Sequence, residues 1–155
     1  MILRAALATV LLAALPPSAA SACSGTLSGP VVGAFECTVA MTPGKDGQFS
    51  IVVAPSGKIA GVERFLPATF EFAGRPTAGT FHLASFTGAR VSMQTTGKTT
   101  YRAGLAAGKR QGDVILNIDT VEREARGGFT LSGRMTARLE PDSGKGGPVV
   151  MEIAF

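Results

Sequence analysis

The sequence has few of the side chains on which most recognisable functional sites depend. Its 155 residues include no tryptophan, one tyrosine, one histidine and two cysteines. Flat aromatic rings form the binding platforms of carbohydrate modules and the girdles of membrane β-barrels, so their scarcity argues against both classes. A single histidine cannot hold zinc without clustered cysteines or acids. We therefore expect no metal and no cofactor.

Neither sign of charge is in large excess. The chain has 15 Lys and Arg against 11 Asp and Glu, a net charge of +4 at neutral pH. One of the basic residues, Arg4, lies in the N-terminal segment described next. The basic side chains form no run, and almost no aromatic residues lie among them. Nucleic-acid binding is therefore not expected.

The longest run without charge lies at the N-terminus. Ala5–Leu15 is apolar, a basic residue precedes it, two prolines end it, and the small residues Ser18–Ala22 follow. This is the order of a secretory signal peptide with cleavage after Ala22. A membrane-spanning helix would need about 20 apolar residues. We therefore predict that residues 1–22 are a signal peptide and that residues 23–155 form one domain with no membrane span.

Export would place Cys23 and Cys37 in an oxidising compartment, where an even number of cysteines favours a disulfide. Such a bridge would close a loop of about 15 residues, worth ~3 kcal/mol in the chain-entropy model. In a lipoprotein, the thiol of Cys23 would instead be acylated. Ala20 stands where a lipobox prefers Leu, and acylation would leave Cys37 without a partner. We expect a disulfide in a periplasmic or secreted protein, with a lipid anchor through Cys23 as the alternative.

The remaining sequence alternates with a period of two residues, which indicates strands. Phe35, Cys37, Val39 and Met41, for example, are separated by polar or small residues. Turn residues divide similar runs at the spacing typical of sandwiches and barrels. The further runs cover residues 49–53, 66–72, 81–83, 91–93, 114–121, 129–139 and 149–155. We predict a monomeric all-β domain, an antiparallel β-sandwich or flattened barrel of about 8–9 strands.

The clearest element is a hairpin formed by the runs at 114–121 and 129–139. We expect Leu116 and Leu131, together with Ile153 on the last strand, to face the core. Oxygens at alternate strand positions lie about 6.7 Å apart, too far for a compact calcium cage. We therefore expect the polar residues of the other face to pair across the hairpin. They are Asp113, Asn117 and Asp119, opposite Ser132, Arg134, Thr136 and Arg138.

Two sets of side chains invite a catalytic interpretation. His82 is predicted at an exposed strand position, and no Gly-x-Ser-x-Gly turn presents a nucleophile. Four glutamates offer acid and base pairs for sugar hydrolysis, but no ring is present to stack a sugar. They are Glu63, Glu71, Glu122 and Glu124. We predict no catalytic residue, and a small secreted hydrolase using His82 or a carboxylate pair remains the alternative.

Loops carry function more often than strands do, which leaves two candidate segments for partner contact. The first is the charged loop between the hairpin strands, and the second is Lys98–Arg110. The alternative interpretation of Lys98–Arg110 is an ordinary long connection. The contact candidates are Glu122, Arg123, Glu124, Arg126, Tyr101 and Arg102. The alternating residues before Phe155 also imitate the terminal strand of an outer-membrane β-barrel, a third alternative.

Several stretches resemble small exported bacterial β-sandwich domains of unknown function. They are Cys23–Cys37, Gly74–Thr80, Tyr101–Ala103, Leu131–Leu139 and Val149–Phe155. The resemblance consists of strand and turn patterns, and it implies export and a β-sandwich without transferring any catalytic residue. Together with the lack of a catalytic constellation, it favours a non-catalytic binding or cell-envelope interaction module.

Overall fold

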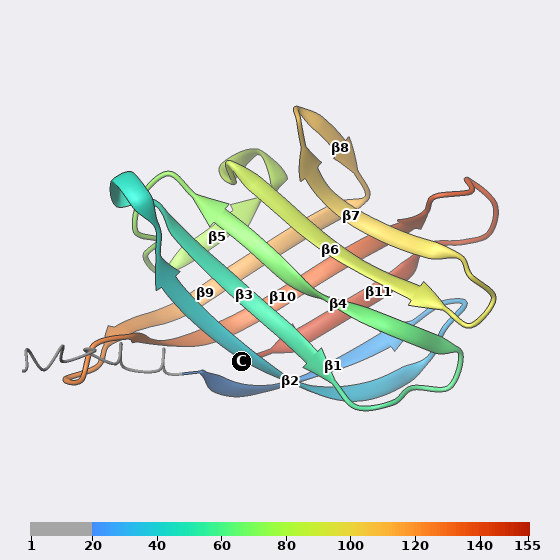
Figure 1. The fold of residues 1–155 in the computed structure, drawn as a ribbon, viewed down its shortest axis with the longest axis horizontal. Helices are drawn as coiled ribbons and strands as arrows, with labels where there is room; N and C mark the ends of the chain where they lie inside the picture. The colour runs from blue at the N-terminus through green and yellow to red at the C-terminus, as the bar shows by residue number, and fades with distance from the viewer. Residues whose placement is uncertain (1–19) are drawn as a thin grey trace, which may run out of the picture.

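The computed structural model describes residues 20–155, which fold almost entirely as antiparallel strands (Figure 1). The predicted signal peptide, residues 1–22, therefore lies outside the described residues except for its last three positions. Two short 3-10 turns, η1 (Lys45–Gly47) and η2 (Leu83–Ser85), interrupt the strands. The strands are β1 (Ser21–Ser28), β2 (Gly33–Pro43), β3 (Phe49–Ser56), β4 (Val62–Phe72), β5 (Gly79–His82), β6 (Gly88–Thr95), β7 (Thr100–Ala106), β8 (Lys109–Gln111), β9 (Asp113–Arg123), β10 (Phe129–Pro141) and β11 (Val149–Ala154).

Eight of these strands form a closed barrel in the order β10-β11-β1-β2-β3-β4-β6-β7. The barrel closes where the end of β10 pairs with β7, through Glu140 with Arg102 and Pro141 with Tyr101. β9 pairs with the earlier part of β10 and carries β5, while β8 extends β7. In Figure 1, β3, β4 and β6 cross in front of β9 and β10, as in a flattened barrel. The predicted fold class is thus confirmed.

The interior of the barrel is packed with apolar side chains. Leu116, Leu131 and Ile153 are only 0%, 3% and 2% exposed, as the alternation of the sequence predicted. Phe72 packs edge-on against both Phe81 and Phe86, with ring centroids 5.2 and 5.3 Å apart. This cluster joins β4 to β5 and to the turn that follows β5. None of the helical turns within residues 20–155 has the length and apolar character needed to cross a membrane.

The hairpin of β9 and β10 has nearly the predicted pairing. Asp113 lies opposite Arg138 and Asn117 opposite Arg134. The register shifts between Ser132 and Gly133, so the pairs beyond this bulge are displaced from a simple ladder. The bulge occurs at a glycine with φ of +158°, where a Cβ would collide with the carbonyl oxygen of Asn117.

The prediction of eight or nine strands was too low, because β1, β7 and β8 were not recognised. β1 has small and hydroxylated side chains with little apolar alternation, yet it forms part of the barrel wall between β11 and β2. The predicted cleavage after Ala22 falls within this strand, whose first two residues pair with Val39 and Thr38.

The interpretation of Lys98–Arg110 as an ordinary long connection was wrong, since β7 and β8 form a hairpin there. Gly104 interrupts the alternation of this segment, and the strand accommodates it because β6 passes unusually close. Its φ is +154°, and a Cβ at this position would collide with the carbonyl oxygen of Ala89. Gly104 therefore marks a close backbone contact inside a sheet.

Candidate functional site

One hollow on the surface, which we name the mixed-charge groove, crosses the outward faces of β10, β11, β1 and β2. Its volume is about 950 Å³, within the range of ligand-binding clefts. Its charged side chains come from four places in the sequence and carry both signs. They are Arg134 on β10, Glu152 on β11, Glu36 on β2 and Lys58 in the turn after β3.

The mixed-charge groove is hollow because its central side chains are short. Thr26 on β1 lies directly opposite Glu152 of β11 on one side and Ala34 of β2 on the other. One step along the strands, Ser24 lies between Ala154 and Glu36 in the same way. Hydroxyl and methyl groups thus form the floor, and longer charged side chains stand around it.

The charges of this groove remain accessible to a partner. Within residues 20–155, two ion pairs form, Arg102 with Asp142 and Arg138 with Glu140, and both lie outside the groove. Glu36 lies opposite Ser24 and Glu152 lies opposite Thr26, on the two sides of β1. Their Cα atoms are therefore two strand spacings apart across the sheet and two residues apart along it, about 12 Å in all. The arrangement suits several spaced polar contacts with one extended partner.

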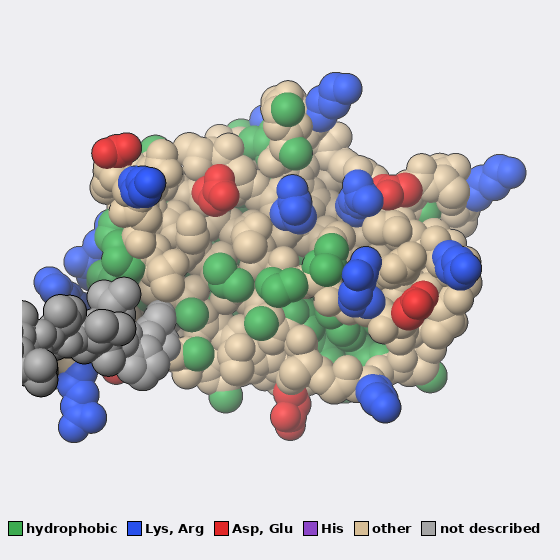
Figure 2. All heavy atoms as spheres, viewed as in Figure 1, with side chains coloured by type: hydrophobic (Ala, Val, Ile, Leu, Met, Phe, Trp, Pro, Cys, Tyr) green, Lys and Arg blue, Asp and Glu red, His purple; other side chains and the backbone are tan. Residues whose placement is uncertain are grey.

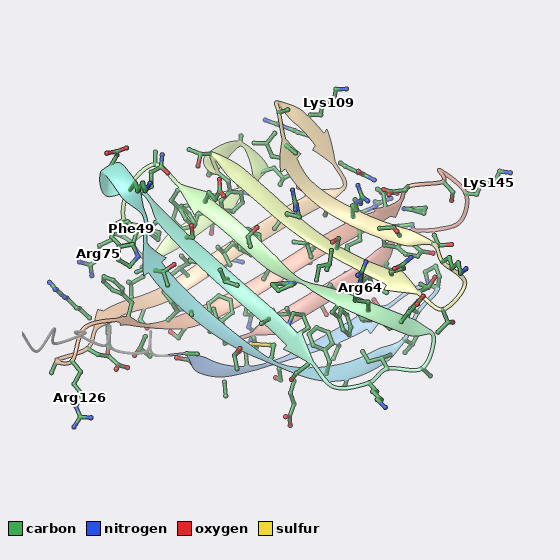
Figure 3. All side chains as sticks on the ribbon, in the orientation of Figure 1. Phe49, Arg64, Arg75, Lys109, Arg126 and Lys145 are labelled. Atoms are coloured by element: carbon green, nitrogen blue, oxygen red, sulfur yellow. A yellow bond between two sulfur atoms is a disulfide. The ribbon has the colours of Figure 1, made fainter. Side chains whose placement is uncertain are left out.

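The second hollow, which we name the basic groove, lies on the outward faces of β4, β6, β7 and β8. Its volume is about 690 Å³. Figure 2 shows basic side chains gathered over these strands, and Figure 3 labels Arg64 on β4 and Lys109 on the projecting β7–β8 hairpin. The basic residues that line it are Arg64, Arg90, Arg102, Lys109 and Arg110, and no acidic residue lines it.

The disulfide predicted between Cys23 and Cys37 is confirmed. The two residues face each other across β1 and β2, with Cα atoms 4.8 Å apart and both side chains in the core. The sulfur of Cys23 is bonded to Cys37, which leaves no thiol for a lipid anchor. The bridge ties together two strands that carry the floor of the mixed-charge groove.

The residues considered for catalysis lie outside both grooves. His82 is exposed at the end of β5, and its backbone N–H donates a hydrogen bond to the hydroxyl of Ser85, 3.3 Å away. This serine therefore helps to cap a 3-10 turn. Neither ion pair of the described residues involves this histidine. Glu63, Glu71, Glu122 and Glu124 likewise line neither groove.

The structure separates the residues considered for partner contact. Glu122, Arg123, Glu124 and Arg126 are exposed at the β9–β10 turn, which closes through hydrogen bonds between the backbones of Glu124 and the following glycines. Tyr101 is only 6% exposed, and its ring belongs to the core. The next residue, Arg102, points outward and lines the basic groove. Of these two adjacent residues, Tyr101 therefore packs in the core and Arg102 lies on the surface.

Sequence reasoning did not find either groove, since each is assembled from strands that are distant in sequence. The alternation at residues 91–93 did predict the strand that carries Arg90, Ser92 and Gln94. It did not indicate which strands lie beside them. In the part of the chain that the structure describes, no three His, Cys, Asp or Glu residues come close enough to hold a metal ion.

Comparison with known proteins gives no relative from which a role can be carried over. No protein-family model, no curated protein and no solved structure matches this chain.

Proposed function

We propose that this protein is an exported, non-catalytic binding module that contacts a bacterial cell-envelope partner through the mixed-charge groove. The observation that carries the proposal is the groove itself, a hollow of about 950 Å³ across β10, β11, β1 and β2. Charged side chains of both signs surround a floor of hydroxyl and methyl groups. Such a surface offers hydrogen bonds and ion pairs to a polar partner.

Export is supported by two independent features. The N-terminal sequence has the order of a signal peptide. The disulfide between Cys23 and Cys37 indicates a compartment outside the cytoplasm, because cytoplasmic thiols are kept reduced. A periplasmic or secreted protein has both features.

Binding is favoured over hydrolysis by the positions of the chemically active side chains. His82 and the serine beside it cap a turn at the surface, away from both grooves. The apolar filling of the barrel supports the same proposal over a membrane-spanning channel, whose interior is polar. The two outer grooves are the candidate binding surfaces.

The proposal is tested with a groove variant and a matched control. Thr26 and Thr38 are both exposed outward positions on adjacent strands, but only Thr26 lines the groove. The labelled full-chain protein, with its disulfide formed, is sedimented with purified peptidoglycan and, separately, with outer-membrane vesicles. We expect saturable binding to one of the two, weakened about tenfold or more by Thr26→Arg and unchanged by Thr38→Arg.

Equal binding by both variants, or no binding to either preparation, would contradict the proposal. We also expect His82→Ala to bind as the unmodified protein does. A bond-breaking activity on either preparation that disappears in His82→Ala would support the hydrolase instead.

A further inference from the structure

The basic groove is distinct from the mixed-charge groove, since it lies on the outward faces of β4, β6, β7 and β8. Its most buried polar side chain is that of Ser92, on β6, which is only 3% exposed although it faces outward. It is the one buried polar or charged residue among the described positions. Leu66 on β4 and Arg102 on β7 lie directly opposite it on either side.

Arginines surround this hydroxyl on three sides. Arg90 lies two residues before Ser92 on the same strand, about 6.7 Å along it. Arg102 lies directly across, one strand spacing of about 4.8 Å away. Arg64 lies opposite Gln94, two residues beyond Ser92, on the other neighbouring strand. The sheet register therefore places three guanidinium groups around one recessed floor.

These positive charges are compensated by a single carboxylate. Arg102 pairs with Asp142 at 3.2 Å, and that aspartate also accepts a hydrogen bond from Gln111. No carboxylate of the described residues pairs with Arg64, Arg90, Lys109 or Arg110. Like charges held this close repel one another, and an anionic ligand would relieve the repulsion. Guanidinium forks also match the paired oxygens of phosphate and sulfate.

The shape and the neutral side chains of the groove restrict what kind of anion fits. From β4 to β8 it spans three strand spacings, about 14 Å, more than a single phosphate can fill. It has no aromatic lining, so neither nucleic-acid bases nor the rings of a neutral sugar can stack there, and the ligand must be held by ion pairs and hydrogen bonds. This disfavours single-stranded nucleic acids, which bind largely by stacking their bases on aromatic rings. It is recessed, whereas a bilayer surface is flat. Ser92, Gln94, Thr100 and Gln111 offer hydroxyl and amide groups suited to sugar hydroxyls.

We propose that the basic groove binds a soluble anionic glycan, an oligosaccharide chain that carries several phosphate or sulfate groups. The guanidinium groups of Arg64, Arg90 and Arg102 hold the anionic groups around Ser92. The basic residues of the β7–β8 hairpin hold the part of the chain that leaves the groove. This second site goes beyond the proposed function, because it takes a different partner on a different face.

The test uses a heparin oligosaccharide of defined length and the same oligosaccharide with its sulfates removed. Binding to the disulfide-intact full chain is measured by titration calorimetry at about 0.15 M salt, where weak surface attraction is screened. We expect micromolar binding of the sulfated chain and none of the desulfated chain. The double variant Arg64→Ala with Arg90→Ala should weaken binding at least tenfold.

A matched control removes the same charge elsewhere. Arg123→Ala with Arg126→Ala, in the exposed β9–β10 turn, should leave the affinity unchanged. Arg64→Lys with Arg90→Lys keeps the positive charge but loses the paired N–H donors of the guanidinium groups. We expect this variant to bind the sulfated chain with an affinity between those of the unmodified protein and the alanine double variant. All variants are compared by thermal unfolding, and their surface positions should leave the folded state intact.

Three outcomes would overturn the proposal. They are no binding of the sulfated chain, equal weakening by the two alanine double variants, and tighter binding to single-stranded DNA or to vesicles of phosphatidylglycerol than to the glycan. Thr26→Arg should leave glycan binding intact, so failure of this proposal is distinguishable from failure of the one for the mixed-charge groove.

Discussion

The mixed-charge groove and the basic groove are both built from outward positions of antiparallel strands, but they differ in how their charges are balanced. Around the first, Glu36 and Glu152 balance Arg134 and Lys58. Around the second, Asp142 is the carboxylate that pairs with a lining residue. The first surface is nearly neutral without a partner, whereas the second keeps an excess of positive charge. The comparison shows that one scaffold can present two chemically different surfaces.

The strands beneath the two grooves are also held together differently. β1 and β2 are joined by the disulfide and belong to the barrel wall, where each is paired with a neighbouring strand on both edges. β7 pairs with β6 along most of its length, but its other edge is shared between two residues' pairing with β10 and three residues' pairing with β8. β8 itself is an edge strand of three residues. We therefore expect the mixed-charge groove to be the more rigid of the two.

Removal of the disulfide should have the largest effect on this comparison. Replacing both Cys23 and Cys37 with alanine is expected to lower the free energy of unfolding by about 3 kcal/mol, because the unfolded chain gains loop entropy. For a domain of this size the melting temperature should fall by roughly 10 °C, measurable by calorimetry. Hydrogen exchange should accelerate in β1 and β2 more than in β6 and β7.

A reductant is the control for this variant, since it should destabilise the unmodified protein and leave the double alanine variant unaffected. Uniform acceleration of exchange across all strands would show that the disulfide does not rigidify the mixed-charge groove in particular.

Gly104→Ala should have the next largest effect, on the side of the basic groove. The new methyl group would meet the carbonyl oxygen of Ala89, a backbone atom that cannot move without disturbing β6. We expect a loss of about 2 kcal/mol in unfolding free energy, from the collision and the positive φ together. Urea denaturation measures this loss directly.

Gly108→Ala provides the matched control in the same hairpin. Its φ is +75°, but no atom lies within 4 Å of the position a Cβ would take. The expected loss is about 1 kcal/mol, from the backbone conformation alone. Equal losses in the two variants would contradict the close approach of β6 and β7.

The sequence was sufficient to predict the fold class, because a strand with one buried face has apolar residues at every second position. Phe35, Val39 and Met41 on β2 are buried as their spacing predicted. β1 lacks this apolar alternation, since Gly25 takes a core position where the ring of Phe35 covers it. A side chain from another strand fills that space, and this is not visible in the local pattern.

The grooves were less predictable than the fold, for a related reason. Arg64, Arg90 and Arg102 are separated by 26 and 12 positions in the sequence, and each reads as an isolated surface charge. Only the strand order brings them together around Ser92. Strand order depends on long-range pairing, and alternation within one strand contains no information about it.

The smallest expected effect comes from Asp142→Asn, which makes the two grooves differ more in charge. Loss of the exposed ion pair with Arg102 should cost at most about 1 kcal/mol of stability. A positive charge that the carboxylate had balanced would then face the basic groove. At ~7 Å in water one charge contributes about 0.6 kcal/mol, so the heparin oligosaccharide should bind about threefold more tightly. The same titration in Glu36→Gln, across the molecule in the mixed-charge groove, should show no change. Equal tightening in both variants would mean that net charge alone governs binding, and the basic groove would then be no specific site.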